Sequence, residues 1–169
     1  MENNIVTHTL KPIFNTESSV LILGTMPSPK SRANNFYYGN PQNRFWKVLS
    51  AVFDEKLPES NKERTELLLK HRIALWDVLA SCEIKGADDS SIKNPVPNDL
   101  SIILDACNIK AIFTTGKKAF SLYQRFCEPK TKIPAISLPS TSPANCRMSL
   151  ESLVESYMLI KKAIYSQEM

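Results

Sequence analysis

The chain has 169 residues, of which 43% are hydrophobic and 22% are charged, and its formal net charge is +4. This length is typical of one domain, and the composition excludes a wholly disordered chain. The four glycines stand too far apart for a G-x-G-x-x-G motif, and Gly116-Lys117-Lys118 lacks the final Ser or Thr of a phosphate-binding loop. Binding of dinucleotides or nucleoside triphosphates through such loops is therefore disfavoured.

Cysteine and histidine usage excludes further classes of protein. The four cysteines never approach C-x-x-C spacing, and two histidines are too few for a three-histidine zinc site, so we expect no metal and no cofactor. The N-terminus lacks the pattern of a signal peptide, and no apolar stretch approaches the roughly 20 residues of a membrane span. We expect a monomer without membrane contact, cytoplasmic in a bacterial-type cytosol or associated with the nucleoid.

Short apolar runs and amphipathic segments alternate along the chain. In order they predict a strand over 18–24, a polar loop over 25–42, helices over 43–53 and 61–71, a strand over 73–79, a polar loop over 81–91, a helix over 98–107, a strand over 109–116, a helix over 117–126, a strand over 133–138, a polar loop over 139–148 and a helix over 150–164. Strands that alternate with helices predict a three-layer α/β/α sandwich around a short, mostly parallel four-stranded sheet. One domain then spans 1–169, with residues 1–17 as an N-terminal extension.

The polar segments that follow the four predicted strands form the candidate site. Open parallel sheets bind ligands beyond the carboxyl ends of their strands, so these segments are expected to form one polar rim. The first loop combines aromatic and amide side chains, which suit a pocket that stacks on a flipped base and reads its edge. Core packing is the favoured interpretation for Phe45 and Trp46, whereas Tyr38 is the candidate for base stacking.

Two of these loops also carry a family resemblance. GTMPS followed by YYGNPQNRFWKVLSAVF resembles the first motif of the uracil-DNA glycosylase superfamily, and PSTSPAN over 139–145 resembles its second motif, a loop that enters the minor groove. WDVLASCEIKG and TTGKKAF lie between them in the same order, so the resemblance covers most of the chain. Within the superfamily, the chain resembles above all the hypoxanthine-DNA glycosylase (deoxyinosine glycosylase) branch. The resemblance implies a metal-independent base excision repair enzyme whose partner is DNA with a deaminated base.

Two departures from the superfamily pattern concern the chemistry. Met26 stands where related enzymes have a catalytic Asn or Asp, and Leu138 stands where the uracil enzymes have a His. A thioether cannot orient or deprotonate water. The resemblance implies that the catalytic residue is instead the Asn of the N-x-F-W segment, which is Asn43. From the residues alone, Asn43 could hold the attacking water or cap the helix that follows it, and both roles are compatible.

The expected base-binding residues surround Asn43. Asp77 ends a predicted strand, and its carboxylate could accept the N1–H of hypoxanthine, although a strand-end Asp could equally bond to nearby backbone. Tyr38 is expected to stack on the base, and Thr25 and Met26 complete the base-binding set. The acidic pair Asp88 and Asp89 is interpreted as solvated charge, although one of the two could orient water.

A second set of residues is expected to hold the DNA backbone. Lys117 and Lys118 oppose the dipole of the helix that they begin, a conflict that a bound phosphate would relieve, although two exposed lysines are an equal alternative. Pro143 or Met148 could wedge into the base stack. The other expected DNA contacts are hydroxyl, amide and basic side chains of the two motif loops: Ser28, Lys30, Arg32, Ser140, Thr141, Ser142, Asn145 and Arg147.

These observations favour a monofunctional DNA glycosylase that flips a nucleotide, releases hypoxanthine by water attack at C1′ and leaves an abasic site. No lysine is placed for a Schiff base, so lyase activity is not expected. One alternative is a glycosylase for uracil in G:U mismatches. Another is a catalytically silent DNA-binding module of the same fold. A small-molecule hydrolase is disfavoured because no Ser–His or metal constellation is present.

Overall fold

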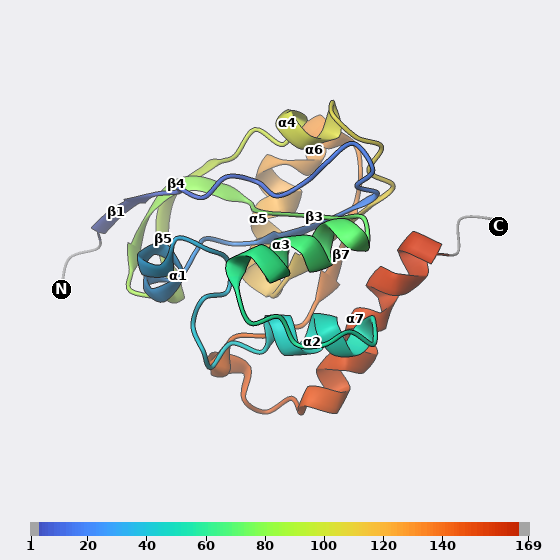
Figure 1. Cartoon of the computed structure of the whole chain (residues 1–169). Helices are drawn as coiled ribbons and strands as arrows, with labels where there is room; N and C mark the ends of the chain where they lie inside the picture. The colour runs from blue at the N-terminus through green and yellow to red at the C-terminus, as the bar shows by residue number, and fades with distance from the viewer. Residues whose placement is uncertain (1–3, 166–169) are drawn as a thin grey trace.

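A sheet of four parallel strands forms the centre of the computed structural model, which describes residues 4–165 (Figure 1). Across the sheet the order is β3 (Ile73–Asp77), β2 (Val20–Gly24), β6 (Ala111–Thr115) and β7 (Ala135–Leu138). Every residue of β2 and β3 is buried, as expected for apolar runs in a sheet covered on both faces. All four strands predicted from the sequence are confirmed.

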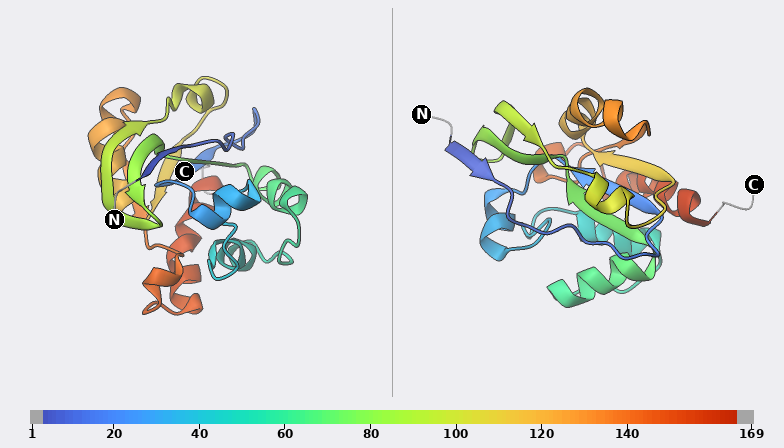
Figure 2. Two further views of the ribbon diagram at one scale, coloured as in Figure 1. Left: turned by 90° about the vertical axis from the view of Figure 1, so that its left-hand side faces the viewer. Right: turned by 90° about the horizontal axis from the view of Figure 1, so that it is seen from above.

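Helices cover both faces of this sheet, so the predicted three-layer sandwich is confirmed (Figure 2). On one face lie α2 (Phe45–Val52), α3 (Asn61–Lys70) and α7 (Leu150–Tyr165), and α2 packs directly on α7. On the other face lies α5 (Lys117–Phe126), followed by the one-turn helix α6 (Glu128–Thr131). The helices bury apolar stripes against the sheet, which is how amphipathic segments stabilise such a fold.

The structure contains a second sheet, of three strands, that the sequence did not predict. β4 (Leu79–Lys85) and β5 (Asp88–Pro97) form an antiparallel hairpin, and β1 (Asn4–Thr7) pairs with the other edge of β4. The polar loop predicted over 81–91 is therefore wrong. The pattern that was missed is the alternation of buried Cys82 and Ile84 with more exposed polar neighbours, which is typical of a strand with one covered face.

Two predicted segments differ from the structure in their helical content. The loop over 25–42 contains a short helix, α1 (Pro29–Asn34), which begins after the cap residue Ser28 and ends at Asn35 in a left-handed conformation. The helix predicted over 98–107 is a single turn, α4 (Ser101–Leu104). Asn98 cannot start that helix earlier because its side chain donates to backbone carbonyls of the strands, at 2.9 and 3.0 Å.

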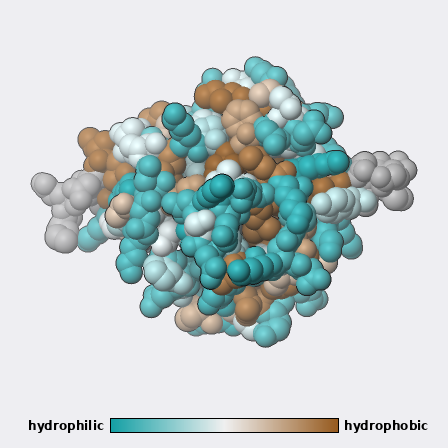
Figure 3. Space-filling view, viewed as in Figure 1, coloured by the Kyte–Doolittle hydropathy of each residue, from teal (hydrophilic) through white to brown (hydrophobic). Residues whose placement is uncertain are grey.

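The surface seen in Figure 3 is largely hydrophilic, with smaller hydrophobic areas between the polar ones. Over residues 4–165, no helix combines the length and apolar character that crossing a bilayer requires. The apolar residues gather instead in one core between the sheet and its helices. The polar side chains of interest lie where the parallel strands end.

Candidate active site

A pocket opens at the carboxyl ends of the parallel strands, where the sequence predicts a polar rim. Its volume is about 130 Å³, well below the roughly 300–1,000 Å³ of sites that hold drug-sized ligands. The structure brings four separate chain segments together in its wall. They contribute Thr25, Met26, Ser28, Tyr38, Asn43, Asp77, Asp89, Thr115, Ser140, Thr141 and Ser142. A space of this size suits one flat base.

Asp77 ends β3 and lies at the floor of this pocket, with 4% of its surface exposed. Its Oδ2 lies 2.8 Å from Nε2 of His8. Its Oδ1 packs against Gly24 so closely that a Cβ at this glycine would lie 2.5 Å from it. Glycine is therefore required here by close approach rather than by an unusual backbone angle.

Tyr38 forms one wall of the pocket in a strained backbone conformation, with a φ of +52°. Its ring stacks on Phe45 with 3.8 Å between ring centroids and 11° between planes. Its hydroxyl lies 3.1 Å from the hydroxyl of Thr115. Burial, and secondarily the charge of Asp77, raise the pKa of Tyr38, so the phenol stays protonated. Because Phe45 covers one face of the ring, a base can stack only on the other.

Asn43 lies at the rim, directly before α2. Its Oδ1 accepts hydrogen bonds from the backbone N–H of Phe45 at 2.9 Å and from the hydroxyl of Thr141 at 2.8 Å. The cap residue of α2 is Arg44, which makes no side-chain cap bond, so Asn43 stands one residue before the cap and its bond to Phe45 only supports the start of the helix. An amide oxygen has two lone pairs, so both are occupied. The Nδ2 group has no hydrogen-bond partner among residues 4–165, and it is the part of the amide left to contact a ligand or a water molecule.

Thr25, Met26 and Asp89 line the same pocket. Thr25 is buried, and its side chain acts to lower the pKa of Asp89, whose carboxylate comes from the hairpin. The surroundings of that carboxylate raise the pKa of Asp89, chiefly through burial, while nearby Lys118 opposes this effect. Asp89 is exposed, in agreement with its interpretation as solvated charge, and it also borders the pocket because residues 81–91 form a hairpin rather than a loop.

A wider cavity adjoins the pocket at the start of α5. It is lined by Lys117, Ser140, Ser142 and Asn145, together with Asp89, and has a volume of about 660 Å³. Lys117 is exposed at the first turn of the helix, whereas Lys118 faces Asp89. The hairpin carboxylate therefore supplies the negative charge that the N-terminal turn of α5 lacks in its own sequence.

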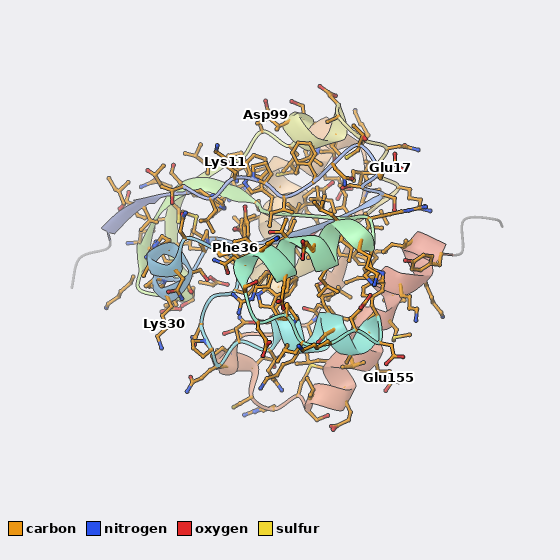
Figure 4. The ribbon with its side chains drawn as sticks, in the orientation of Figure 1. Lys11, Glu17, Lys30, Phe36, Asp99 and Glu155 are labelled. Atoms are coloured by element: carbon orange, nitrogen blue, oxygen red, sulfur yellow. The ribbon has the colours of Figure 1, made fainter. Side chains whose placement is uncertain are left out.

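The remaining predicted DNA contacts divide into two groups. Pro143 and Asn145 are the first and last residues of a short 3-10 helix, η1 (Pro143–Asn145), beside this cavity. The side-chain amide of Asn145 donates to the carbonyl of Ser140 at 2.9 Å. Lys30, Arg32 and Arg147 do not line the pocket. Lys30 lies on the outer side of α1 (Figure 4), and Arg147 is exposed.

Arg32 and Met148, which were also expected to contact DNA, are both packed in part against the rest of the protein. Nη1 of Arg32 is buried without a hydrogen-bond partner, and the guanidinium charge acts on the thiol of Cys82. Met148 packs against the core, although it also borders the wider cavity. No three or more His, Cys, Asp or Glu side chains in the described part of the chain are grouped so that they could hold a metal ion.

The fold and the order of its motifs have counterparts among known proteins. A family model described as the uracil DNA glycosylase superfamily matches residues 12–161. The chain belongs to this superfamily. A curated relative from Methanosarcina barkeri, named hypoxanthine DNA glycosylase, is 37% identical over 145 residues, which cover 83% of this chain and 89% of the relative. A protein of the same name from Methanosarcina acetivorans is 35% identical over 141 residues, covering 81% and 87%.

A solved structure supports the same assignment. The solution NMR structure of a candidate uracil DNA glycosylase from Methanosarcina acetivorans has a TM-score of 0.77 and 27% identity, and the match covers 94% of this chain and 99% of that one. The expected glycosylase-like fold is thus confirmed, and the resemblance of the two loops reflects true membership of the superfamily. This member is a DNA glycosylase by family, with its polar pocket at the edge where the two motif loops meet.

One residue of this superfamily member that we did not single out from the sequence is Arg44. Its guanidinium donates to the carbonyls of Met148 at 2.6 Å and Asn145 at 3.0 Å, and its backbone N–H donates to Thr141 at 3.1 Å. These bonds tie the second motif loop to the start of α2. An Arg beside a candidate catalytic Asn gives no periodic or spacing signal, so only the packed fold shows this role.

Proposed function

We propose that the chain is a monofunctional DNA glycosylase that removes hypoxanthine from DNA. The observation that carries the proposal is the position of the Asp77 carboxylate at the floor of a pocket the size of one base. Hypoxanthine presents a donor at N1, whereas adenine presents an acceptor there. An ionised carboxylate accepts from the first and repels the second. The names of the two Methanosarcina relatives support the same substrate.

Tyr38 supplies the stacking surface for the flipped base. The stack on Phe45 and the bond to Thr115 fix the orientation of the ring before the base arrives, which leaves its other face for the base. Such preorganisation lowers the entropy cost of binding. Thr25 and Met26 close the pocket next to it, and the thioether of Met26 contributes apolar contact rather than proton transfer.

Asn43 positions the attacking water through its free Nδ2 group, with Oδ1 anchored by Phe45 and Thr141. Glycosidic cleavage passes through an oxocarbenium-like transition state, so the placement of the water and the stabilisation of charge contribute more than strong base catalysis. The products are free hypoxanthine and an abasic site. No lysine of the described chain lines this pocket, which supports direct hydrolysis rather than a Schiff base.

The DNA backbone lies along the wider cavity, where Lys117, Ser140 and Ser142 contact phosphates. Lys30 and Arg147, both exposed, supply longer-range attraction to the duplex. In this proposal the enzyme acts as a cytosolic monomer and needs no metal ion.

A panel of duplexes tests the proposal directly. Each duplex carries one deoxyinosine, one uracil opposite guanine or no modification, and alkali converts abasic sites into strand breaks. We expect breaks on the deoxyinosine strand under single-turnover conditions. Breaks only at uracil would identify the mismatch-specific alternative. Salt-sensitive binding without any break at enzyme excess would identify a silent DNA-binding module and contradict the proposal.

A further inference from the structure

We propose that His8 is a positioning residue that orients the carboxylate of Asp77 to accept the N1–H of hypoxanthine. This inference rests on the proposed function. The two side chains meet at 2.8 Å between Nε2 and Oδ2, and only 2% and 6% of their surfaces are exposed. His8 thus approaches Asp77 from behind, while Asp77 itself lines the pocket.

Aromatic neighbours fix the orientation of the His8 ring. It lies 6.1 Å from the ring of Tyr37 and 6.3 Å from that of Trp76, the latter almost edge-on at 81°. The backbone N–H of His8 donates to the carbonyl of Ala80. A ring held on two sides and through its backbone can aim one nitrogen at one carboxylate oxygen with little freedom.

The segment that carries His8 is fastened on both sides of this ring, to β4 through the pairing of β1 before it and to β3 through Ile13 after it (Figures 1 and 4). The Tyr37 hydroxyl donates to the carbonyl of Lys11 at 2.6 Å. Further along, Ile13 and Leu75 exchange backbone hydrogen bonds of 2.9 Å in both directions. Residues 4–13 are therefore part of the wall behind the pocket floor.

The electrostatic surroundings explain why Asp77 needs such a donor. Tyr37 and Tyr38 from the first motif loop and Asp89 from β5 all face its charge, and each is an acid. A buried carboxylate needs hydrogen-bond donors. The Nε2–H of His8 supplies one in the neutral and in the cationic imidazole alike, because both can donate at that nitrogen.

The consequence is discrimination between purines. An ionised Asp77 accepts from N1–H of hypoxanthine. A protonated Asp77 could donate to N1 of adenine, the normal base, and would no longer reject it. His8 therefore acts on base selection without contacting the base.

The test compares three variants by single-turnover release of hypoxanthine and of adenine over a pH series. His8→Phe keeps an aromatic ring between Tyr37 and Trp76 but removes the donor. His8→Gln restores an amide donor. His71→Phe is the matched control, because the other histidine of the chain also pairs with a carboxylate, Glu55 at 2.7 Å, away from the pocket.

For His8→Phe we expect the preference for hypoxanthine over adenine to fall about tenfold or more, because one hydrogen bond to a charged group is lost. His8→Gln recovers most of this preference, and His71→Phe does not alter it. Thermal melting of each variant separates these effects from loss of folded protein.

Two results would overturn the inference in different ways. If the unmodified enzyme releases hypoxanthine and folded His8→Phe has the same preference for hypoxanthine over adenine, His8 has no positioning role. If the unmodified enzyme releases no hypoxanthine, the proposed function fails first and the assignment of His8 fails with it.

Discussion

Substitution of Gly24 by Ala tests the geometry of the pocket floor most directly. The added Cβ would lie 2.5 Å from Oδ1 of Asp77 and 2.9 Å from the hydroxyl of Tyr38. The backbone of Gly24 is not in the left-handed region, so the collision is the whole perturbation. To reach an ordinary contact of 3.4 Å, the carboxylate must retreat by roughly 0.9 Å.

That displacement sets the size of the expected effect. A misplacement of about 1 Å at a reacting or recognition group can reduce the rate about 100-fold, so we expect a loss of this order in single-turnover release of hypoxanthine. Overpacking a core costs about 1–3 kcal/mol, which corresponds to a melting temperature lower by about 2–12 °C at this chain length. The assay is cleavage of the deoxyinosine duplex, with thermal melting measured in parallel.

Gly86→Ala is the matched control. Gly86 has a φ of +60°, and nothing lies within 4 Å of its added Cβ, so the variant strains the hairpin turn without touching Asp77. Strain of this kind costs about 1–2 kcal/mol. We expect Gly86→Ala to lose stability but retain base release. A folded Gly24→Ala enzyme with the unmodified rate would refute the view that Asp77 and Tyr38 must keep their positions.

Three other predictions concern single side chains. Asn43→Ala should abolish measurable base release and also lower the free energy of unfolding by about 1 kcal/mol, because the hydrogen bonds to Phe45 and Thr141 are lost; activity at the original level removes the proposed mechanism. Because the pKa of Asp89 is raised, the folded protein binds a proton at this carboxylate more tightly than the unfolded chain does. This contribution to stability is fully present below the ordinary pKa of 3.8 and is lost as the pH rises through the raised pKa. Asp89→Asn should therefore melt at a higher temperature near neutral pH and gain nothing in acid, and an equal gain in both would contradict the assignment. Lys117→Gln should reduce the slope of log Kd against log salt for DNA binding by about one, whereas Lys62→Gln on α3 should not.

The parallel core could be predicted because its signals are local. The apolar runs of β2 and β3 are buried on both faces, so composition alone identifies them. The hairpin could not be found in this way, because half of its side chains face water and its polar residues resemble those of a loop. One turn of helix at α4 replaced a longer predicted helix, because Asn98 is held by strand carbonyls distant in sequence.

The candidate site was predicted in part for similar reasons. Asp77 ends a strand, Asn43 lies just before a helix and Tyr38 lies in the loop between α1 and α2, and the structure places all three in one pocket. His8 and Arg44 could not be assigned from the sequence, because each acts across a long separation, 69 residues to Asp77 and 101 residues to Asn145.

The bonds of Arg44 have a consequence for how DNA must approach. Together with the Thr141–Asn43 bond, they hold residues 43–44 against residues 141–148, so these two edges of the pocket cannot move apart independently. Hydrogen bonds from a charged group contribute about 1.5–3 kcal/mol each, which makes opening by this route expensive. Deformation on base capture therefore falls on the duplex rather than on the protein. A weakly paired nucleotide leaves its helix more readily than a well-paired one. Because the pocket entrance is rigid and does not adapt to the duplex, this difference in pairing strength favours the capture of damaged nucleotides.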